Sequence, residues 1–267
     1  AEENGVNYLF EASVGGGIPI IRPMSQCLIA NNIEGVAGIL NGTTNFILTK
    51  MIEDGMTFEA ALKLAQDNGY AEKDPTADIE GFDACRKVCI LASLAFGKHV
   101  YPNQVEAEGI TNITLEDVSY ISSIGGVIKL LGQIKYINDD KIAAFVSPAV
   151  VFHGSQLASV NGVFNAILVR GDAVGDVCFY GQGAGKLATA SAVVADMVDS
   201  AVHVERRINF GWSAGNEDYV VDEKATIEMP FYVRAKSSEP KVKALLNDVK
   251  FLTRVGQPSD EVAFITD

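Results

Sequence analysis

The chain has 267 residues, 48% of them hydrophobic, and a formal net charge of −13. This length and apolar content predict a sizeable core in one large domain, or in a domain with an appendage. The acidic balance argues against nucleic acid as a partner, because a phosphate backbone binds clustered Lys and Arg. We also expect no membrane partner, since no apolar run is as long as a span and the start AEENG does not resemble a signal peptide.

Residues 8–14 are predicted to form a core strand that begins almost at the first residue. Natural chains rarely begin so abruptly, so we expect a fragment or a processed chain. The turn GGGIP at 15–19 follows, and its backbone can approach an ion or a phosphate closely. A plain glycine turn before the next predicted helix, at 20–31, explains the same residues equally well.

A predicted strand at 33–40 leads into the run Asn-Gly-Thr-Thr at 41–44, which opens a helix at 46–53. Hydroxyls and free N–H groups at a helix start bind an anion, or they cap the helix. Capping alone accounts for one threonine, so both interpretations stay open. A further helical run, 57–68, brings the chain to its most informative stretch.

Residues 65–87, AQDNGYAEKDPTADIEGFDACRK, contain two close turns and the start of another helix. The loop between the turns carries Tyr70 and Glu72, and the helix is predicted to begin near Pro75, a favoured first helical residue. Gly81 inside that helix costs about 1 kcal/mol relative to Ala, which suggests a close approach by backbone or ligand.

Asp83 and Lys87 are four residues apart on this helix and therefore lie on one face. Beyond Lys87 the helix is apolar on every side, which indicates a buried helix. The ordinary interpretation is an exposed pair that contributes about 0.3 kcal/mol. Four further carboxylates upstream, Asp78 among them, favour a candidate active site at Lys87 instead.

The second half of the chain predicts five strands, at 105–110, 127–136, 142–152, 163–169 and 174–179. With the two earlier strands they predict an α+β fold, a large mixed β-sheet with helices covering one face. The loop GQGAGK at 181–186 then opens a long alanine-rich helix at 187–202. A glycine loop before a helix is a ready anion site, but this one matches neither the Walker nor the Rossmann pattern.

Residues 218–267 are more charged than the rest, so we divide the chain into a main domain at 1–217 and a short extension. The extension is predicted to be a small α+β tail. Its expected elements are a strand at 226–235, a helix at 240–249 and a strand at 262–266.

The stretch 65–87 resembles the signature of homoserine dehydrogenases, which reads A-x3-G-Y, a short spacer, D-P-x-x-D and then G-x-D-x3-K. The matching residues are Ala65, Gly69, Tyr70, Asp74, Pro75, Asp78, Gly81, Asp83 and Lys87. The resemblance covers roughly residues 7–205, and so many fixed positions make it specific. It implies a cytoplasmic oxidoreductase of threonine and methionine biosynthesis that interconverts homoserine and aspartate 4-semialdehyde with NADP or NAD.

The resemblance also implies roles for individual residues. The catalytic group is Lys87, Glu72 and Asp83, with Lys87 moving a proton or stabilising the alkoxide. The substrate-binding residues are Gly42, Thr43, Tyr70, Glu72, Asp78, Asp83 and Lys87. The residues beside the nicotinamide end of the cofactor are Thr43, Gly183 and Gly185. A monovalent cation such as sodium is held by Glu11 and by the carbonyls of Val14, Gly16 and Ile18, since oxygen ligands suit a hard cation.

In this family the first strand follows an N-terminal Rossmann domain, and no G-x-G-x-x-G follows a strand near the start of this chain. We therefore expect the isolated chain to fold and to form a homodimer, yet to be inactive. The tail lies where many bacterial members carry an ACT domain, which binds an amino acid. It lacks the usual P-G-V-L and is short for a βαββαβ unit, so we expect a truncated ACT-like tail.

Two other classes stay open. An aspartate-semialdehyde dehydrogenase needs an activated Cys, and Cys85 and Cys89 lack a nearby His in sequence. We interpret all four cysteines as reduced core residues. The other class is a non-catalytic amino-acid-binding regulatory or oligomerisation module, in which the tail binds the amino acid. Amino-acid binding that depends on Glu72 or Asp83, and not on the tail, argues against that class.

Overall fold

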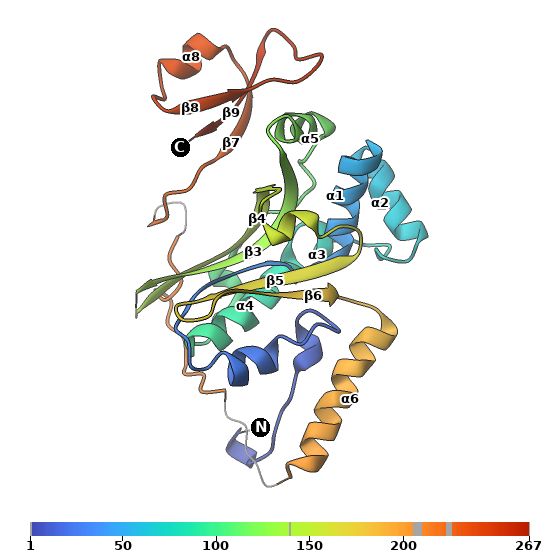
Figure 1. The fold of residues 1–267 in the computed structure, drawn as a ribbon, viewed down its shortest axis with the longest axis vertical. Coiled ribbons are helices and arrows are strands. Elements are labelled where there is room, and N and C mark those ends of the chain that lie inside the picture. The colour runs from blue at the N-terminus through green and yellow to red at the C-terminus, as the bar shows by residue number, and fades with distance from the viewer. Residues whose placement is uncertain (1, 139, 205–209, 223–225, 267) are drawn as a thin grey trace.

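The computed structural model describes residues 2–138, 140–204, 210–222 and 226–266 (Figure 1). Its main body is a six-stranded mixed sheet in the order β2-β4-β3-β1-β5-β6. The strands are β1 (Ile33–Ile39), β2 (Glu106–Ala107), β3 (Gly126–Asn138), β4 (Lys141–Phe152), β5 (Phe164–Gly171) and β6 (Gly175–Gln182). Neighbouring strands run antiparallel, except that β2 is parallel to β4. The predicted class, a mixed sheet with helices, is confirmed.

The helices of the main body are α1 (Gly42–Asp54), α2 (Phe58–Asp67), α3 (Thr76–Ile79), α4 (Phe82–Phe96), α5 (Leu115–Ser122) and α6 (Lys186–Val202). Shorter turns are η1 (Glu2–Asn4), η2 (Glu11–Ser13), η3 (Pro23–Cys27), η4 (Pro102–Gln104) and η5 (Gln156–Ser159). α4 packs on β1, β3 and β4, whereas α6 stands apart from the sheet beside η2 (Figure 1). Within the described residues, no helix has both the length and the apolar content needed to cross a bilayer.

Side chains alternate between the two faces of the sheet, as a pleated strand requires. On β3, Ile128, Leu130 and Ile134 join the large core that also contains the buried residues of α4. Val127 and Leu131 point to the other face, which packs on η5. The helix-covered face therefore holds most of the core, and it is the face on which α4 carries Lys87 toward the end of β1.

The predicted strand at 8–14 is wrong, because residues 11–13 form the turn η2. The Glu11 carboxylate is buried and accepts the backbone N–H groups of Ile20, Ile21 and Arg22 at 2.6, 2.8 and 2.9 Å. These bonds replace a strand ladder and hold the segment against a helix start. The helix expected at 20–31 is also shorter than predicted. It continues as the π-type turn η3, which ends at Leu28, whose N–H donates to the carbonyl oxygen of Pro23.

The single helix expected from Pro75 to Lys87 is instead two helices, α3 and α4. They separate at Gly81, whose φ of +80° is a left-handed conformation that glycine adopts without strain. A Cβ at Gly81 would lie 3.4 Å from the carbonyl oxygen of Glu108, an ordinary van der Waals distance, so the left-handed φ rather than the predicted close backbone approach accounts for this glycine. The strand expected at 105–110 is reduced to the two residues of β2.

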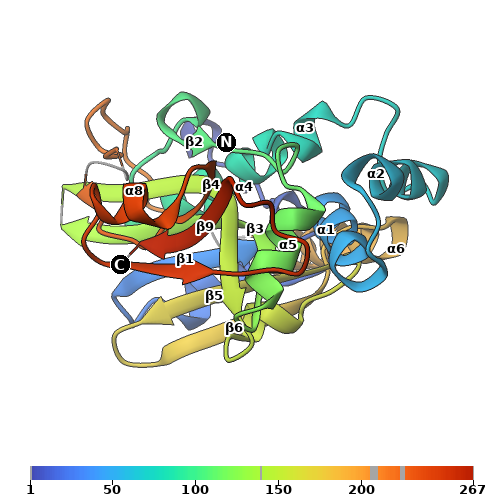
Figure 2. The same cartoon turned by 90° about the horizontal axis from the view of Figure 1, so that it is seen from above.

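The tail forms a second sheet in the order β7-β9-β8, beside α5 in both views (Figures 1 and 2). Its elements are β7 (Tyr232–Lys236), α8 (Glu239–Lys243), β8 (Val249–Leu252) and β9 (Glu261–Thr266). The last strand lies where it was predicted. The strand expected at 226–235 begins only at Tyr232. The helix expected at 240–249 ends at Lys243, and β8 begins at the last position of that range.

Candidate active site

The predicted residues around Lys87 meet where the start of α1 faces the break between α3 and α4. Asn41 caps α1, its Oδ1 accepting the N–H of Thr44 at 2.9 Å. Its Nδ2 donates to Asp78 Oδ1 at 2.7 Å and to Asp83 Oδ2 at 3.0 Å. One capping side chain therefore joins the start of α1 to a carboxylate from each of the two following helices.

Lys87 completes this group, and we call Asn41, Asp78, Asp83 and Lys87 the Lys87 cluster. Lys87 Nζ donates to Asp83 Oδ2 at 2.7 Å and to the carbonyl oxygen of Leu40 at 2.8 Å. The side chain of Lys87 is 19% exposed and that of Asp83 is 31% exposed, so a ligand can reach both. An ammonium group has three N–H donors. After these two contacts within the described residues, one donor is left for a ligand.

The Lys87 cluster is short of positive charge, with two carboxylates facing one ammonium. Burial raises the pKa of Asp78 above its ordinary value, and the negative charge of Asp83 acts in the same direction. The hydrogen bond from Asn41 and the charge of Lys87 oppose this rise without cancelling it. A cationic group on a ligand would restore the balance.

The loop after α2 borders the same place. Thr43 Oγ1 donates to the carbonyl oxygen of Tyr70 at 2.7 Å, and the Tyr70 ring packs edge-on against Phe46 at 5.0 Å between centroids. Glu72 lies on this loop with an exposed side chain. Within the part of the chain that the structure describes, its carboxylate takes no part in the hydrogen bonds of the Lys87 cluster. The structure therefore brings Thr43 beside the cluster and leaves Glu72 in solvent.

Of the two predicted cofactor glycines, Gly183 meets the start of α1 at Asn165 on β5. A Cβ on Gly183 would lie 2.1 Å from Asn165 Cγ, and a Cβ on Gly42 would lie 3.5 Å from its Oδ1. Gly185 caps α6 with a φ of +118°. Asn165 is 1% exposed, and neither its Oδ1 nor its Nδ2 has a hydrogen-bond partner among the described residues. A buried amide without a partner is rare, and the sequence analysis missed Asn165 because it is an isolated polar residue in a strand.

The predicted cation site lies on the other side of the glycine loop. A Cβ on Gly16 would lie 2.3 Å from the carbonyl oxygen of Gly183, so the turn at 14–18 touches this loop. The oxygens of Glu11 and of the turn are of the type that binds a hard cation. However, the Glu11 carboxylate already accepts three backbone N–H groups and lies 3.9 Å from Arg22 Nε. The donor types fit a monovalent cation, and the burial of Glu11 is explained without one.

The cysteines do not form a nucleophilic site. Cys85 and Cys89 are buried on α4, and the Cys85 thiol points at the carbonyl oxygens of Pro102 and Val105, at 3.7 and 3.9 Å. The hydrogen bond with Cys85 and burial raise the pKa of the Cys89 thiol far above its ordinary value. Cys27 and Cys178 are exposed, so the prediction that all four are core residues holds only for the pair on α4.

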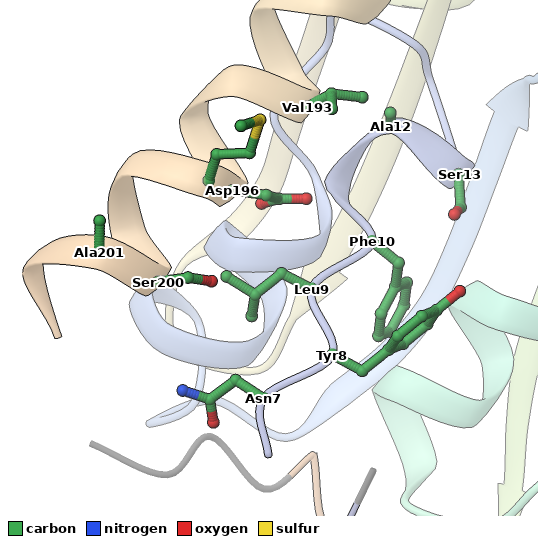
Figure 3. Close-up of a pocket in the computed structure, with 11 residues that line it drawn as sticks. Asn7, Tyr8, Leu9, Phe10, Ala12, Ser13, Val193, Asp196, Ser200 and Ala201 are labelled. Carbon is green, nitrogen blue, oxygen red and sulfur yellow. The ribbon is translucent and has the colours of Figure 1, made fainter. Parts of the chain in front are cut away.

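A separate hollow of about 720 Å³ lies between α6 and the segment that precedes η2 (Figure 3). Figure 3 shows Tyr8 and Phe10 on one side of it and Val193 and Asp196 on the other. The lining residues are Asn7, Tyr8, Leu9, Phe10, Ala12, Ser13, Val193, Asp196, Met197, Ser200 and Ala201. These do not include the Lys87 cluster, so the hollow and the candidate active site are different places.

Comparison with known proteins shows the family. The family model described as homoserine dehydrogenase matches residues 19–198. Among curated relatives, the homoserine dehydrogenase of Synechocystis sp. is 48% identical over 202 residues, which are 74% of this chain and 47% of the relative. That of Bacillus subtilis is 48% identical over 198 residues, 74% of this chain and 46% of the relative. The chain spans about half the length of these relatives.

Solved structures give the same result. A homoserine dehydrogenase from Thiobacillus denitrificans has a TM-score of 0.83 and 38% identity, over 100% of this chain and 64% of that one. A hyperthermophilic archaeal homoserine dehydrogenase in complex with NADPH has a TM-score of 0.65 and 32% identity, over 76% of this chain and 58% of that one. The similarity therefore includes the whole sheet and its helices.

Proposed function

The chain belongs to the homoserine dehydrogenase family, and on this basis we propose that it is the substrate-binding half of an oxidoreductase. The enzyme would interconvert homoserine and aspartate 4-semialdehyde with NAD or NADP, in threonine and methionine biosynthesis. One observation carries the proposal. Lys87, held by Asp83 and Leu40, keeps one N–H donor beside a cluster that is short of one positive charge. Homoserine has an ammonium group and a carbinol oxygen that match these two features.

In the proposed mechanism the substrate's ammonium group binds between Asp78 and Asp83, where it balances the excess negative charge. The spare N–H of Lys87 donates to the carbinol oxygen and stabilises the charge that develops there. Lys87 first loses a proton to solvent, and its neutral amine then takes the carbinol proton as hydride leaves; in the reverse direction Lys87 returns that proton to the same oxygen. Asp83 orients Lys87 through the 2.7 Å contact. A bound dinucleotide would supply the acceptor for the hydride of the carbinol carbon.

The cofactor contacts of this chain would be limited to one end of the dinucleotide. Thr43, Gly183 and the unpaired amide of Asn165 are near the start of α1, Gly185 follows two residues after Gly183, and the amide supplies both a donor and an acceptor. The complex of the archaeal relative with NADPH supports NADP as the cofactor. Since a Rossmann domain supplies most of the grip on the pyrophosphate and adenine, titration with NADP+ should show only weak binding to the isolated 267 residues.

We further infer a homodimer and a monovalent cation. Self-association is supported by exposed apolar side chains on α6, namely Leu187, Val194, Met197, Val198 and Val202. Met197→Glu should shift the sedimentation of the chain toward monomer. The cation is supported by the oxygen donors of Glu11 and the turn at 14–18, and an anomalous peak beside Glu11 after rubidium soaking would test it. The unpaired cysteines fit the reducing cytoplasm.

Calorimetric titration with homoserine tests the proposed function directly. Asp83→Asn and Lys87→Met should each weaken binding at least about tenfold. Lys63→Met is the matched control, because Lys63 forms an i,i+4 ion pair on the exposed face of α2. Lys250→Glu on the tail should change nothing. If affinity follows the tail and ignores Asp83, the chain is an amino-acid-binding regulatory module instead.

A further inference from the structure

Lys129 is a buried cation that neither the sheet nor the Lys87 cluster requires. It lies on β3 between Val127 and Leu131 on the apolar face that packs on η5, and it is 1% exposed. An ammonium group taken out of water is costly unless its donors are paired. The contacts that compensate it therefore indicate what it does.

All three donors of Lys129 are used, and all three acceptors are neutral. Its Nζ donates to Asn45 Oδ1 on α1 at 3.1 Å. It also donates to the carbonyl oxygen of Val160 at 2.6 Å and to Asn161 Oδ1 at 3.0 Å, both in the loop between η5 and β5. The ammonium is thus a three-way junction between the sheet, α1 and this loop.

Asn45 reinforces the junction from α1. Its Nδ2 donates to the carbonyl oxygens of Val160, Gly162 and Phe164 at 3.0, 3.0 and 3.1 Å. One turn later, Thr49 Oγ1 accepts the N–H of Gly162 at 3.0 Å. The loop at 160–164 is therefore attached to α1 along more than one turn, and Asn45 Oδ1 is oriented by Lys129.

The same loop bounds the start of α1, where the candidate active site begins. A Cβ on Gly42 would lie 2.9 Å from the carbonyl oxygen of Val163, so the loop backbone touches the first residue of the helix. The preceding residue, Asn41, holds both Asp78 and Asp83. A movement of the loop therefore displaces Gly42 and, with it, the residue that spaces the two carboxylates.

We propose that Lys129 is a positioning residue, whose Nζ hydrogen bonds hold the loop at 160–164 against α1 and so fix Asn41 and the spacing of the two carboxylates. This rests on the proposed function only in naming homoserine as the ligand whose binding reports the spacing. The attachment of the loop can be measured without any ligand.

The charge state of Lys129 makes the role testable. Burial lowers the pKa of Lys129 to about 8, while Glu53 acts in the opposite direction. Glu53 on α1 is the carboxylate that faces Lys129, and it accepts a hydrogen bond from Asn161 Nδ2 at 2.7 Å. The loop at 160–164 presents neutral groups to Lys129, and the neighbour of Lys129 across the strand pair, Ala149 on β4, is also uncharged. Deprotonation leaves two donors for three acceptors, but it also removes the cost of the buried charge, and the lowered pKa means that the closed junction is favoured when the proton is lost.

Hydrogen exchange on the unliganded chain is the first test. Because the closed loop holds the Lys129 proton less tightly than an open, solvated one, the amide protons of Gly162 and Thr44 should gain protection as pH rises above about 8, once the ordinary base catalysis of exchange, measured on exposed amides of the tail, is removed. Lys129→Met should show reduced protection at every pH. Val127→Ala, on the same strand and face, controls for loss of packing and should keep both amides protected. Equal protection in wild type and Lys129→Met overturns the proposal.

Homoserine affinity against pH is the second test. Wild-type affinity should rise as pH rises above about 8, because the closed junction is favoured when Lys129 loses its proton, and Lys129→Met should bind roughly tenfold more weakly at neutral pH without this step. Loss of the ligand's own ammonium proton at higher pH is common to both proteins. Glu53→Gln keeps an acceptor for Asn161 and removes the charge, so the step should move to lower pH.

The two tests separate the possible failures. If the wild-type chain does not bind homoserine, the proposed function fails, and the exchange experiment still decides the role of Lys129. A second outcome is that homoserine binds while the pH step in affinity keeps its position in Glu53→Gln and persists in Lys129→Met. In that case another group titrates, and Lys129 is only structural. Should Lys129→Met fail to fold, the shift in Glu53→Gln alone decides.

Discussion

Two groups of charged side chains in this molecule are built from similar residues and balanced in opposite ways. The Lys87 cluster sets two carboxylates against one ammonium. The second group, which we call the Arg234 cluster, joins α5 to the tail and contains Asp117, Arg234, Arg254 and Glu261. There Arg234 Nε donates to Asp117 Oδ1 at 2.7 Å and Arg254 Nη2 donates to Glu261 Oε1 at 2.8 Å, so charges of both signs are equal in number.

The pKa values of Asp117 and Asp78 are shifted in opposite directions by this difference in charge balance. Burial would raise the pKa of Asp117, but hydrogen bonds from Arg234, Thr114 and Tyr232 outweigh it and hold the pKa below its ordinary value. For Asp78, burial and the charge of Asp83 prevail, and the pKa is raised. A compensated group stabilises the fold, whereas an undercompensated one is suited to a ligand that completes it. We therefore assign the Arg234 cluster to holding the tail and the Lys87 cluster to binding.

The largest expected effect is on turnover. Lys87→Ala, assayed in a form of the protein that turns over homoserine, should lower kcat by about 10²- to 10⁴-fold, the range for a general acid–base group. The melting temperature should change little, because Lys87 is partly exposed. Lys63→Ala is the control, since its i,i+4 pair with Asp67 lacks the second carboxylate. A loss in kcat smaller than tenfold would mean that Lys87 is an ordinary surface lysine, and the contrast between the Lys87 cluster and the Arg234 cluster would not hold.

Substitutions in the Arg234 cluster should lower the stability of the protein and leave homoserine binding unchanged. Arg234→Leu leaves the Asp117 carboxylate buried without its main partner, which should cost about 3 kcal/mol of unfolding free energy. Chemical denaturation measures this, with Arg170→Leu as the control because its pair with Asp176 is exposed. Homoserine affinity should stay within about twofold, within ordinary additivity for distant sites. A loss of affinity that matches the loss of stability would show that the two clusters are coupled.

The elements of both clusters were accessible to sequence reasoning to very different degrees. The strands from β3 to β6 and the segment around Lys87 are predicted because apolar alternation and an i,i+4 spacing are local properties of the chain. The bridge from Asn41 to Asp83 spans 42 positions and the contact of Arg234 with Asp117 spans 117, so no local pattern contains them. Tertiary packing decides such contacts.

The failures have the same origin. Residues 8–14 begin with three apolar or aromatic residues, as a core strand can, yet the buried Glu11 carboxylate accepts three N–H groups at a helix start nine to eleven positions away. Gly81 was recognised as unusual, but the pattern did not show that it ends one helix and begins another. The signature predicted which residue types gather at the site, and the fold decided that Glu72 lies outside the cluster.

Matched substitutions of the two aspartates should change stability in opposite directions. Asp78 has a raised pKa, so its charged form costs stability at pH 7, and that cost disappears as pH falls through the folded pKa. Asp78→Asn should therefore keep or raise the melting temperature at pH 7 while weakening homoserine binding. Asp117→Asn should lose about 2 kcal/mol, because an amide cannot accept all the donors that meet its carboxylate.

The dependence of unfolding free energy on pH distinguishes Asp78→Asn from Asp117→Asn more sharply. The stability contributed by Asp117 is present above its ordinary pKa of 3.8 and is lost as pH falls through the lower folded value. The unfolding free energy of the wild type should therefore fall steeply below about pH 4, and that of Asp117→Asn should fall less steeply. Asp78→Asn should leave this acid limb unchanged. Equal profiles for all three proteins would remove the distinction between a compensated and an undercompensated carboxylate.

The smallest effect is expected from a single hydroxyl of the Arg234 cluster. Tyr232 donates its O–H to Asp117 Oδ1 at 2.9 Å, and the charge of Asp117 with burial raises the pKa of the phenol, so the O–H stays protonated. Tyr232→Phe removes one donor and leaves Arg234 in place, which should cost about 1 kcal/mol. With one donor fewer, the pKa of Asp117 moves back toward its ordinary value, so the acid limb should begin at higher pH. Tyr101→Phe, on an exposed ring, is the control. A drop in stability without that movement would mean that Tyr232 acts through packing, and that the balance of the Arg234 cluster depends on its arginines alone.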